Sequence, residues 1–170
     1  MTYPSGKKDS LGTIDFNSTK DVSFTAAEDG IAKLFFGIGN NYCSLVKSNV
    51  PAGIYQGAEL GVNVIYMIGD FYFYLPEDAK FALLRLYGQG LDEGAKVKVS
   101  DPDGKVVLDI ENLAAAMEVN LGSGSGAKPG VWRIRIDKPS GLSHEDFNIL
   151  LAGLPKFLAT SPEAVPVPAK

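Results

Sequence analysis

The sequence predicts an all-β fold, a two-sheet antiparallel β-sandwich of the jelly-roll type. About ten short apolar or alternating segments are separated by turn signals at intervals of roughly 8–12 residues, the spacing typical of sandwiches and barrels. Helical periodicity is nearly absent from the 170 residues, which include 19 glycines and 10 prolines. The expected division is a flexible N-terminal segment at 1–10, a single sandwich domain at 11–159 and a proline-rich C-terminal tail at 160–170.

Four strands are expected in the first third of the chain. In the second of them Val22 and Phe24 alternate with polar residues, which is the period of a half-buried strand. Asp29-Gly30 is the hairpin signal that follows it. The four expected strands are Thr13–Phe16, Asp21–Thr25, Ile31–Ile38 and Tyr42–Val46.

Three strands are expected between residues 59 and 87. Glu59–Ile68 is predicted to be one long strand, and Lys80–Tyr87 is apolar enough to be a central strand buried on both faces. Between them, the strand Phe71–Leu75 places Phe71, Phe73 and Leu75 on one face. Tyr72 and Tyr74 lie on the opposite face, because successive side chains of a strand point to opposite sides.

The second half of the chain holds the strongest hairpin signal. Lys96–Ser100 and Val106–Ile110 flank Asp101-Pro102-Asp103-Gly104, where proline suits the first central position of a turn and glycine allows positive φ. Asn112–Met117 is expected to form one helical turn or an irregular crossing. Leu121–Lys128 reads LGSGSGAK, which predicts a mobile loop.

The last two expected strands are Val131–Ile136 and Phe147–Leu151. In the first of them Trp132 is expected to face the core, with Arg133 and Arg135 facing outward. No fixed-period repeat is visible in the chain.

Composition excludes several classes of function. The formal net charge is −4, whereas a nucleic-acid-binding protein normally carries a basic surplus. No apolar stretch approaches the roughly 20 residues that span a bilayer, so no membrane association is expected. The first residues, MTYPSGKKDSLGT, lack the apolar region of a signal peptide. A single cysteine excludes an internal disulfide.

Catalytic residues are scarce, so no enzymatic activity is expected. His144 is the one histidine, and it is interpreted as a solvated residue of a polar loop. Cys43 falls within an expected strand, where a free cysteine behaves as a small buried hydrophobe. The acidic residues that could pair for glycoside cleavage fall in turns, where solubility and turn hydrogen bonds account for them.

Metal and cofactor sites are not evident. Asp101–Gly104 resembles the opening of a calcium loop but lacks the later oxygen ligands and the distal glutamate, and a hairpin turn explains each of its residues. No cofactor is expected, and a structural calcium ion elsewhere is left open, because backbone carbonyls can form such sites in β-sandwiches. Whether the chain binds a metal is therefore undetermined.

Tyrosine is the residue type that suggests a ligand. A phenol ring has an apolar face and a polar edge, which suit stacking on the C–H face of a sugar. The guanidinium group of an arginine can donate two hydrogen bonds at once to hydroxyl or carboxylate groups. The candidate ligand-binding residues are Tyr72, Tyr74, Arg133 and Arg135, with the alternative that such tyrosines serve strand formation and packing.

From Phe71 onward the chain resembles a family of non-catalytic modules. The segments FYFYLPEDAKFALLRLYG, KVKVSDPDGKVVLD, KPGVWRIRID and FNILLAGLPKFL carry the likeness. Their order resembles jelly-roll modules of the galactose-binding-domain-like kind, which are often appended to glycoside hydrolases. Pre-peptidase C-terminal domains share the pattern formed here by Gly130, Trp132, Ile134 and Ile136. The resemblance implies a secreted or extracytoplasmic setting in a larger polysaccharide-active protein, and it implies no binding residue.

Two functions follow as expectations. The first is a non-catalytic carbohydrate-binding module of a glycan-degrading enzyme, with an oligosaccharide or polysaccharide as its partner. The alternative is a structural β-sandwich module that packs against a catalytic domain of the same parent protein or against a sister subunit. A binding module would have aromatic residues and converging polar groups along an open groove, whereas a docking module would have a flat apolar patch.

Overall fold

The computed structural model describes residues 1–38, 43–57 and 61–167. The chain divides into two compact units, Met1–Leu45 and Val46–Lys170, referred to below as the N-terminal unit and the sandwich unit. The expected single domain at 11–159 therefore differs from the structure, because the unit that holds both sheets begins at Val46. The expected tail at 160–170 belongs to this unit, and Val165 in it is buried.

The N-terminal unit lacks the expected strands among its described residues. Its ladder contacts are isolated bridges from Thr2 to Lys8 and to Lys33. The structure has no named strand within the described residues of 13–38 and of Tyr42–Val46, where the ladder contact is the bridge at Lys33, and Tyr42 itself lies outside the described residues. Alternation predicts a strand only where a partner strand is present, and a single bridge, from Lys33 to Thr2, does not make one. Cys43 is accordingly exposed rather than buried.

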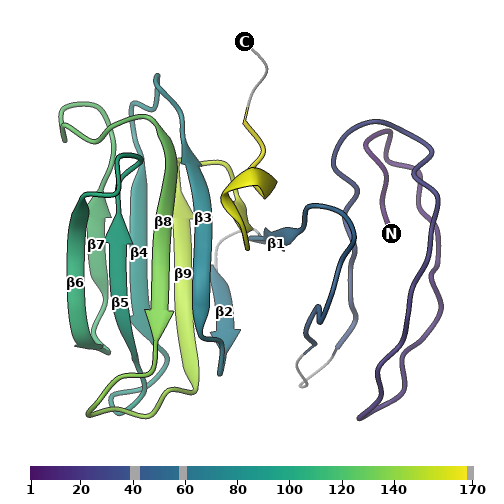
Figure 1. The fold of residues 1–170 in the computed structure, drawn as a ribbon, viewed down its shortest axis with the longest axis horizontal. Helices are drawn as coiled ribbons and strands as arrows, with labels where there is room; N and C mark the ends of the chain where they lie inside the picture. Colours follow the sequence, from purple (N-terminus) through teal and green to yellow (C-terminus); the bar gives the residue numbers. More distant parts are fainter. Residues whose placement is uncertain (39–42, 58–60, 168–170) are drawn as a thin grey trace. The chain divides into compact units, whose positions relative to one another are not determined.

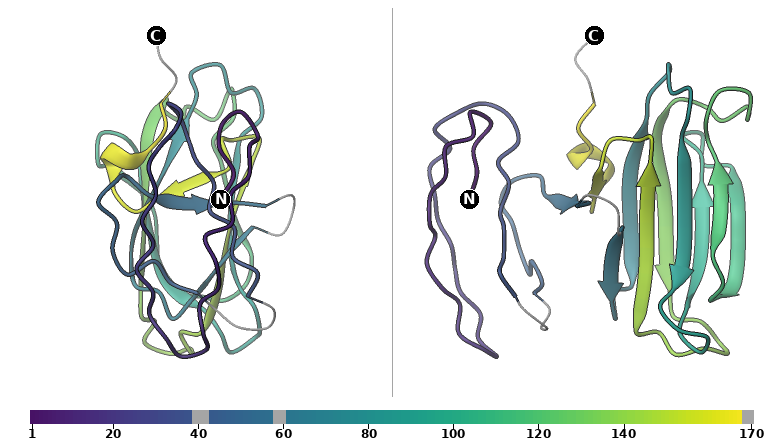
Figure 2. Two further views of the ribbon diagram at one scale, coloured as in Figure 1. Left: turned by 90° about the vertical axis from the view of Figure 1, so that its right-hand side faces the viewer. Right: turned by 180° about the vertical axis from the view of Figure 1, so that it is seen from behind.

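The sandwich unit confirms the expected fold class. The strands among its described residues form a six-stranded sheet of order β1-β10-β3-β8-β5-β6 and a four-stranded sheet of order β2-β9-β4-β7, and the pairings between them are antiparallel (Figures 1 and 2). The orders 3-8-5-6 and 2-9-4-7 are those of a jelly roll, with β10 and β1 added at one edge. The strands are β1 Gly53–Tyr55, β2 Val62–Ile65, β3 Gly69–Leu75, β4 Leu83–Gly88, β5 Ala95–Ser100, β6 Val106–Leu113, β7 Met117–Asn120, β8 Gly130–Asp137, β9 Asp146–Ala152 and β10 Phe157–Ala159.

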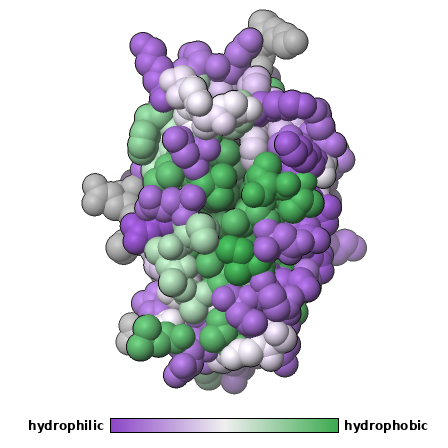
Figure 3. All heavy atoms as spheres, turned by 90° about the vertical axis from the view of Figure 1, so that its left-hand side faces the viewer, coloured by the Kyte–Doolittle hydropathy of each residue, from purple (hydrophilic) through white to green (hydrophobic). Residues whose placement is uncertain are grey.

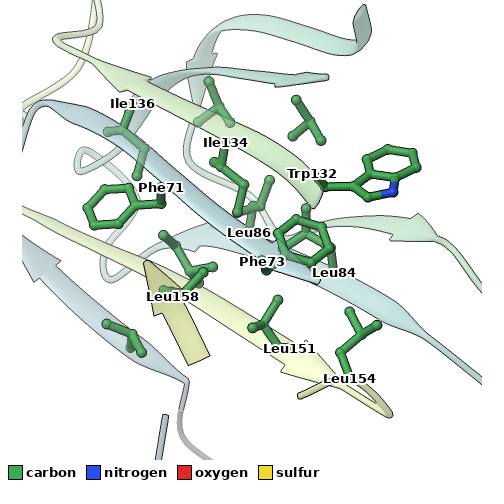
Figure 4. Packing of buried hydrophobic residues seen from close by; sticks show 14 of the residues in the cluster. Phe71, Phe73, Leu84, Leu86, Trp132, Ile134, Ile136, Leu151, Leu154 and Leu158 are labelled. Atoms are coloured by element: carbon green, nitrogen blue, oxygen red, sulfur yellow. The ribbon is translucent and has the colours of Figure 1, made fainter. Parts of the chain in front are cut away.

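The core lies between the two sheets and is formed by the inward phase of each strand (Figure 4). Trp132 is 2% exposed and stacks on Phe73, its partner in the neighbouring strand, with ring centroids 6.2 Å apart. The indole Nε1 donates a hydrogen bond to the carbonyl oxygen of Lys128 at 2.8 Å. Ile134 and Ile136 are fully buried beside it, so the expected phase of this strand is confirmed.

Two strands differ from the expectation. The start of the strand expected at Glu59–Ile68, residues 59–60, lies outside the described residues. Its described part forms β2 and ends at Ile65, because Tyr66 has φ of 53°, outside the extended region. β4 is buried on one face rather than two, since Leu84 and Leu86 point inward while Arg85 is exposed. A strand at the surface of a two-layer sandwich has one face in contact with the core.

One connection between strands confirms the expectation, and another differs from it. In the hairpin from β5 to β6, Asp101 Oδ1 accepts hydrogen bonds from the backbone N–H groups of Asp103 and Lys105, and Gly104 has φ of 82°. The crossing at Asn112–Met117 contains no helical turn, because β6 continues to Leu113 and β7 begins at Met117.

Candidate ligand-binding face

The four candidate residues lie on one face of the six-stranded sheet. Tyr72 of β3 is directly opposite Arg133 of β8, Tyr74 is opposite Val131, and Asp70 is opposite Arg135. The core side chains of both strands point the other way. The outer face that these two strands share with β5 and β6 is called the charged face. It includes Asp70, Tyr72, Tyr74, Lys96, Lys98, Ser100, Asp109, Glu111, Arg133, Arg135 and Asp137.

Ion pairs connect the strands across the charged face. Arg133 Nε donates to Asp70 Oδ1 at 2.8 Å, and Arg135 Nη1 lies 3.7 Å from the other oxygen of Asp70. Arg135 also hydrogen-bonds Asp137, with its Nη2 2.5 Å from Oδ1. On the other side of β5, Lys96 pairs with Glu111 at 2.6 Å and Lys98 pairs with Asp109 at 3.0 Å. Four cations and four carboxylates thus balance in formal charge.

Some of these contacts stabilise the charged forms of the residues that make them. The hydrogen bond to Asp70 raises the pKa of Arg133, and the hydrogen bond to Asp137 raises that of Arg135. The same contact with Arg135 lowers the pKa of Asp137. The Lys96–Glu111 contact raises the pKa of the lysine and lowers that of the glutamate. At neutral pH each of these groups is therefore charged.

A hollow of about 270 Å³ lies on the charged face. Its lining consists of Lys96, Lys98, Ser100, Arg133, Arg135 and Asp137. Tyr72 and Tyr74, on the same outer face, are half-buried. Tyr72 lies directly opposite Arg133, which lines the hollow, but neither Tyr72 nor Tyr74 is among the lining residues.

Sequence reasoning missed several members of this face. Lys96 and Lys98 alternate with valines in the predicted strand. Asp70 directly precedes the expected strand Phe71–Leu75, and Asp137 directly follows the expected strand Val131–Ile136. The alternation predicts that Lys96 and Lys98 point outward, but the order of strands in the sheet decides that β5 lies beside β8. That order depends on contacts between residues far apart in the sequence.

His144 differs from the expected solvated loop residue. Its Nδ1 lies 3.2 Å from the carbonyl oxygen of Gly94, and its Nε2 lies 3.0 Å from that of Met67. The same loop is tied down by the parallel bridge from Glu93 to Ser143. The imidazole therefore connects the loop after β8 to the segments that precede β3 and β5.

Replacing His144 with alanine should lower the free energy of unfolding by about 1–2 kcal/mol, because contacts from both ring nitrogens to carbonyl oxygens are lost. Urea unfolding of the sandwich, followed by the fluorescence of Trp132, measures the change. A variant that unfolds at the wild-type urea concentration would show that the ring is solvated, as the sequence suggested.

No protein-family model matches the chain, and no curated protein matches it. In the described part of the chain, no helix is long and apolar enough to cross a membrane. Residues 1–38, 43–57 and 61–167 likewise contain no group of three or more His, Cys, Asp or Glu side chains placed to hold a metal ion.

Proposed function

We propose that this chain is a non-catalytic carbohydrate-binding module whose charged face binds an oligosaccharide or polysaccharide. The observation that carries the proposal is that Tyr72 lies directly opposite Arg133, which lines the hollow. The outer face of β3 and β8 thus combines a ring for stacking with hydrogen-bonding groups. Converging polar groups beside an aromatic residue are typical of a ligand site rather than of a flat apolar docking patch.

The balanced charges favour a neutral glycan over a polyanion. Each cation of the hollow already has a carboxylate partner, so an anionic ligand would have to displace Asp70, Asp109, Glu111 or Asp137. Sugar hydroxyl groups both donate and accept hydrogen bonds, and they can bind beside such pairs without displacing them. Binding of this kind is modest in affinity, because Tyr72 and Tyr74 are half-buried and offer little apolar area to a ligand.

The setting of the module is part of the same proposal. The resemblance to modules of polysaccharide-active proteins supports an extracytoplasmic location and a catalytic domain in the same parent protein. In this arrangement the module performs no chemistry and raises the local concentration of the glycan near the catalytic domain.

Calorimetric titration with a panel of neutral and uronic-acid polysaccharides tests the proposal. Tyr72→Ala and Tyr74→Ala should each weaken binding of a neutral glycan by about 1–3 kcal/mol, on the scale of stacking between aromatic side chains and planar rings. Binding should change little with salt, since no counterions are released.

Tyr87→Ala is the matched control. This half-buried tyrosine lies on β4 in the other sheet, with its ring 5.4 Å from the guanidinium carbon of Arg85. Its removal should leave glycan affinity unchanged. If no glycan in the panel binds the wild-type chain, or if Tyr87→Ala weakens binding while Tyr72→Ala and Tyr74→Ala do not, the proposal is wrong.

A further inference from the structure

A segment of the N-terminal unit repeats the sequence of β3 and β4. Residues 21–29 align with 70–78, and residues 32–36 align with 82–86 after a loop that is one residue shorter. The two copies share the pattern D-x-x-F-x-x-x-E-D followed by A-x-L. The identical pairs are Asp21 and Asp70, Phe24 and Phe73, Glu28 and Glu77, Asp29 and Asp78, Ala32 and Ala82, and Leu34 and Leu84.

The copies share an inward phase but differ in burial. In β3 and β4, Phe71, Phe73, Leu84 and Leu86 are at most 1% exposed. Their counterparts Val22, Phe24, Leu34 and Phe36 are 39–45% exposed. The segment at 21–36, called the donor segment below, therefore has the side chains of two core strands without a core around them.

The sandwich has an open end at β6 and β7. Within the described residues, β6 pairs with β5 alone and β7 pairs with β4 alone, and the two strands end their sheets on the same side (Figure 1). The inward side chains of this end are partly buried, whereas those of the next strands are fully buried. The partly buried ones are Leu108, Ile110, Met117 and Val119.

Apolar side chains gather on this end of the sandwich. Figure 3, which faces the β6 and β7 side, shows a continuous apolar band bordered by polar residues. On β6 itself, Val106 and Val107 are 44% and 43% exposed. An edge strand with unpaired backbone groups and apolar side chains is a template for another strand.

We propose that the donor segment of a second copy of this chain completes the open end. Residues 21–26 add to β6, and residues 32–36 add to β7. β7 already pairs with β4, so a strand with the pattern of β4 has the side chains that this position accepts: in β4, Leu84 lies opposite Val119. β3 and β4 belong to facing sheets, and β6 and β7 do as well, so one connected strand pair can extend both sheets.

The donor segment and the open end of the sandwich agree in strand length and in apolar character. The donor strands of six and five residues match the eight-residue β6 and the four-residue β7. Addition would cover Leu108 and Val119 with the side chains of Phe24 and Leu34, and it would pair the outer backbone groups of both edges. In the single chain Phe24 and Leu34 are exposed, and Leu108 and Val119 are only partly buried. The proposal does not depend on glycan binding, because the charged face is a different surface.

Light scattering during size-exclusion chromatography of the full chain tests the proposal over a wide concentration range. The wild-type chain should reach the mass of a dimer or of a longer assembly as its concentration rises. Phe24→Asp combined with Leu34→Asp should weaken this association about a hundredfold or more, because assembly would bury unpaired carboxylates. Val119→Asp, on the receiving edge, should do the same.

A mixing experiment distinguishes segment-to-edge addition from pairing between two donor segments. The double variant keeps an intact edge, and Val119→Asp keeps an intact donor segment, so a mixture of the two should form a heterodimer although neither associates alone. Leu91→Asp is the matched control: its side chain is 94% exposed in the loop between β4 and β5, and its association should equal that of the wild type.

Hydrogen exchange gives a measurement that needs no variant. Backbone amides of β6 and β7 should exchange more slowly in the associated wild-type chain than in the dilute chain, together with amides of residues 21–36. A wild-type chain that stays monomeric at every concentration, a Val119→Asp variant that still associates, or a mixture that does not form a heterodimer would overturn the proposal.

Discussion

Trp132→Ala should lower the free energy of unfolding by about 3–5 kcal/mol, the largest loss that we expect from one substitution in this chain. The indole is 2% exposed, and its removal leaves a cavity beside Phe73 in the middle of the six-stranded sheet. The backbone cannot readily close around this cavity, because β8 is paired on both sides, with β3 and β5. Denaturant unfolding followed by circular dichroism measures the loss.

Trp132→Phe is the control that separates the parts of this effect. A phenyl ring keeps most of the stacking on Phe73, but it cannot donate the hydrogen bond that Nε1 makes to the carbonyl oxygen of Lys128. We expect a loss of about 1–2 kcal/mol for this variant. If alanine and phenylalanine cost the same, the hydrogen bond to the 121–129 loop, rather than core packing, is the main contribution of Trp132.

The sequence predicted the sandwich best where each strand buries one face. Trp132, Ile134 and Ile136 share one phase of β8, and Phe71 and Phe73 share one phase of β3, so alternation alone gives the inward set. The same reasoning was wrong for Asp21–Thr25, although Val22 and Phe24 alternate just as clearly. Alternation indicates which side chains of a segment can be buried. It does not indicate which other strand packs against them, because that strand is distant in the sequence.

For the same reason, the sequence predicted only part of the charged face. That Tyr72 and Arg133 both point outward follows from the phase of their strands, but their direct pairing follows from the neighbour relation of β3 and β8. This relation joins residues about 60 positions apart. The repeat of β3 and β4 at residues 21–36 was also missed, because the loops differ by one residue and the match becomes clear only when the buried positions are known.

Gln56 shows how a connection completes a sheet where a strand is too short. β2 begins at Val62, opposite Ile149, so it does not reach Leu151 of β9. The side chain of Gln56 takes the place of a strand residue there: its Oε1 accepts from the N–H of Leu151 at 2.7 Å, and its Nε2 donates to the carbonyl oxygen of Leu151 at 3.2 Å. The side chain is 1% exposed, so water cannot substitute for either contact.

Gln56→Leu should therefore lower the free energy of unfolding by about 2–5 kcal/mol, because it leaves a buried N–H and a buried carbonyl of Leu151 without partners.

Gln56→Glu is the more discriminating variant. At neutral pH its carboxylate accepts from the N–H but faces the carbonyl oxygen without a proton, whereas the protonated acid can donate to that oxygen. Burial and the hydrogen bond both favour the protonated form in the folded state, so the folded pKa of the new side chain is raised. The deficit of Gln56→Glu relative to wild type should consequently shrink as the pH falls, while that of Gln56→Leu should stay constant. Urea unfolding of the three proteins at several pH values makes the comparison, and parallel pH profiles for the two variants would show that Gln56 fills space without pairing with β9.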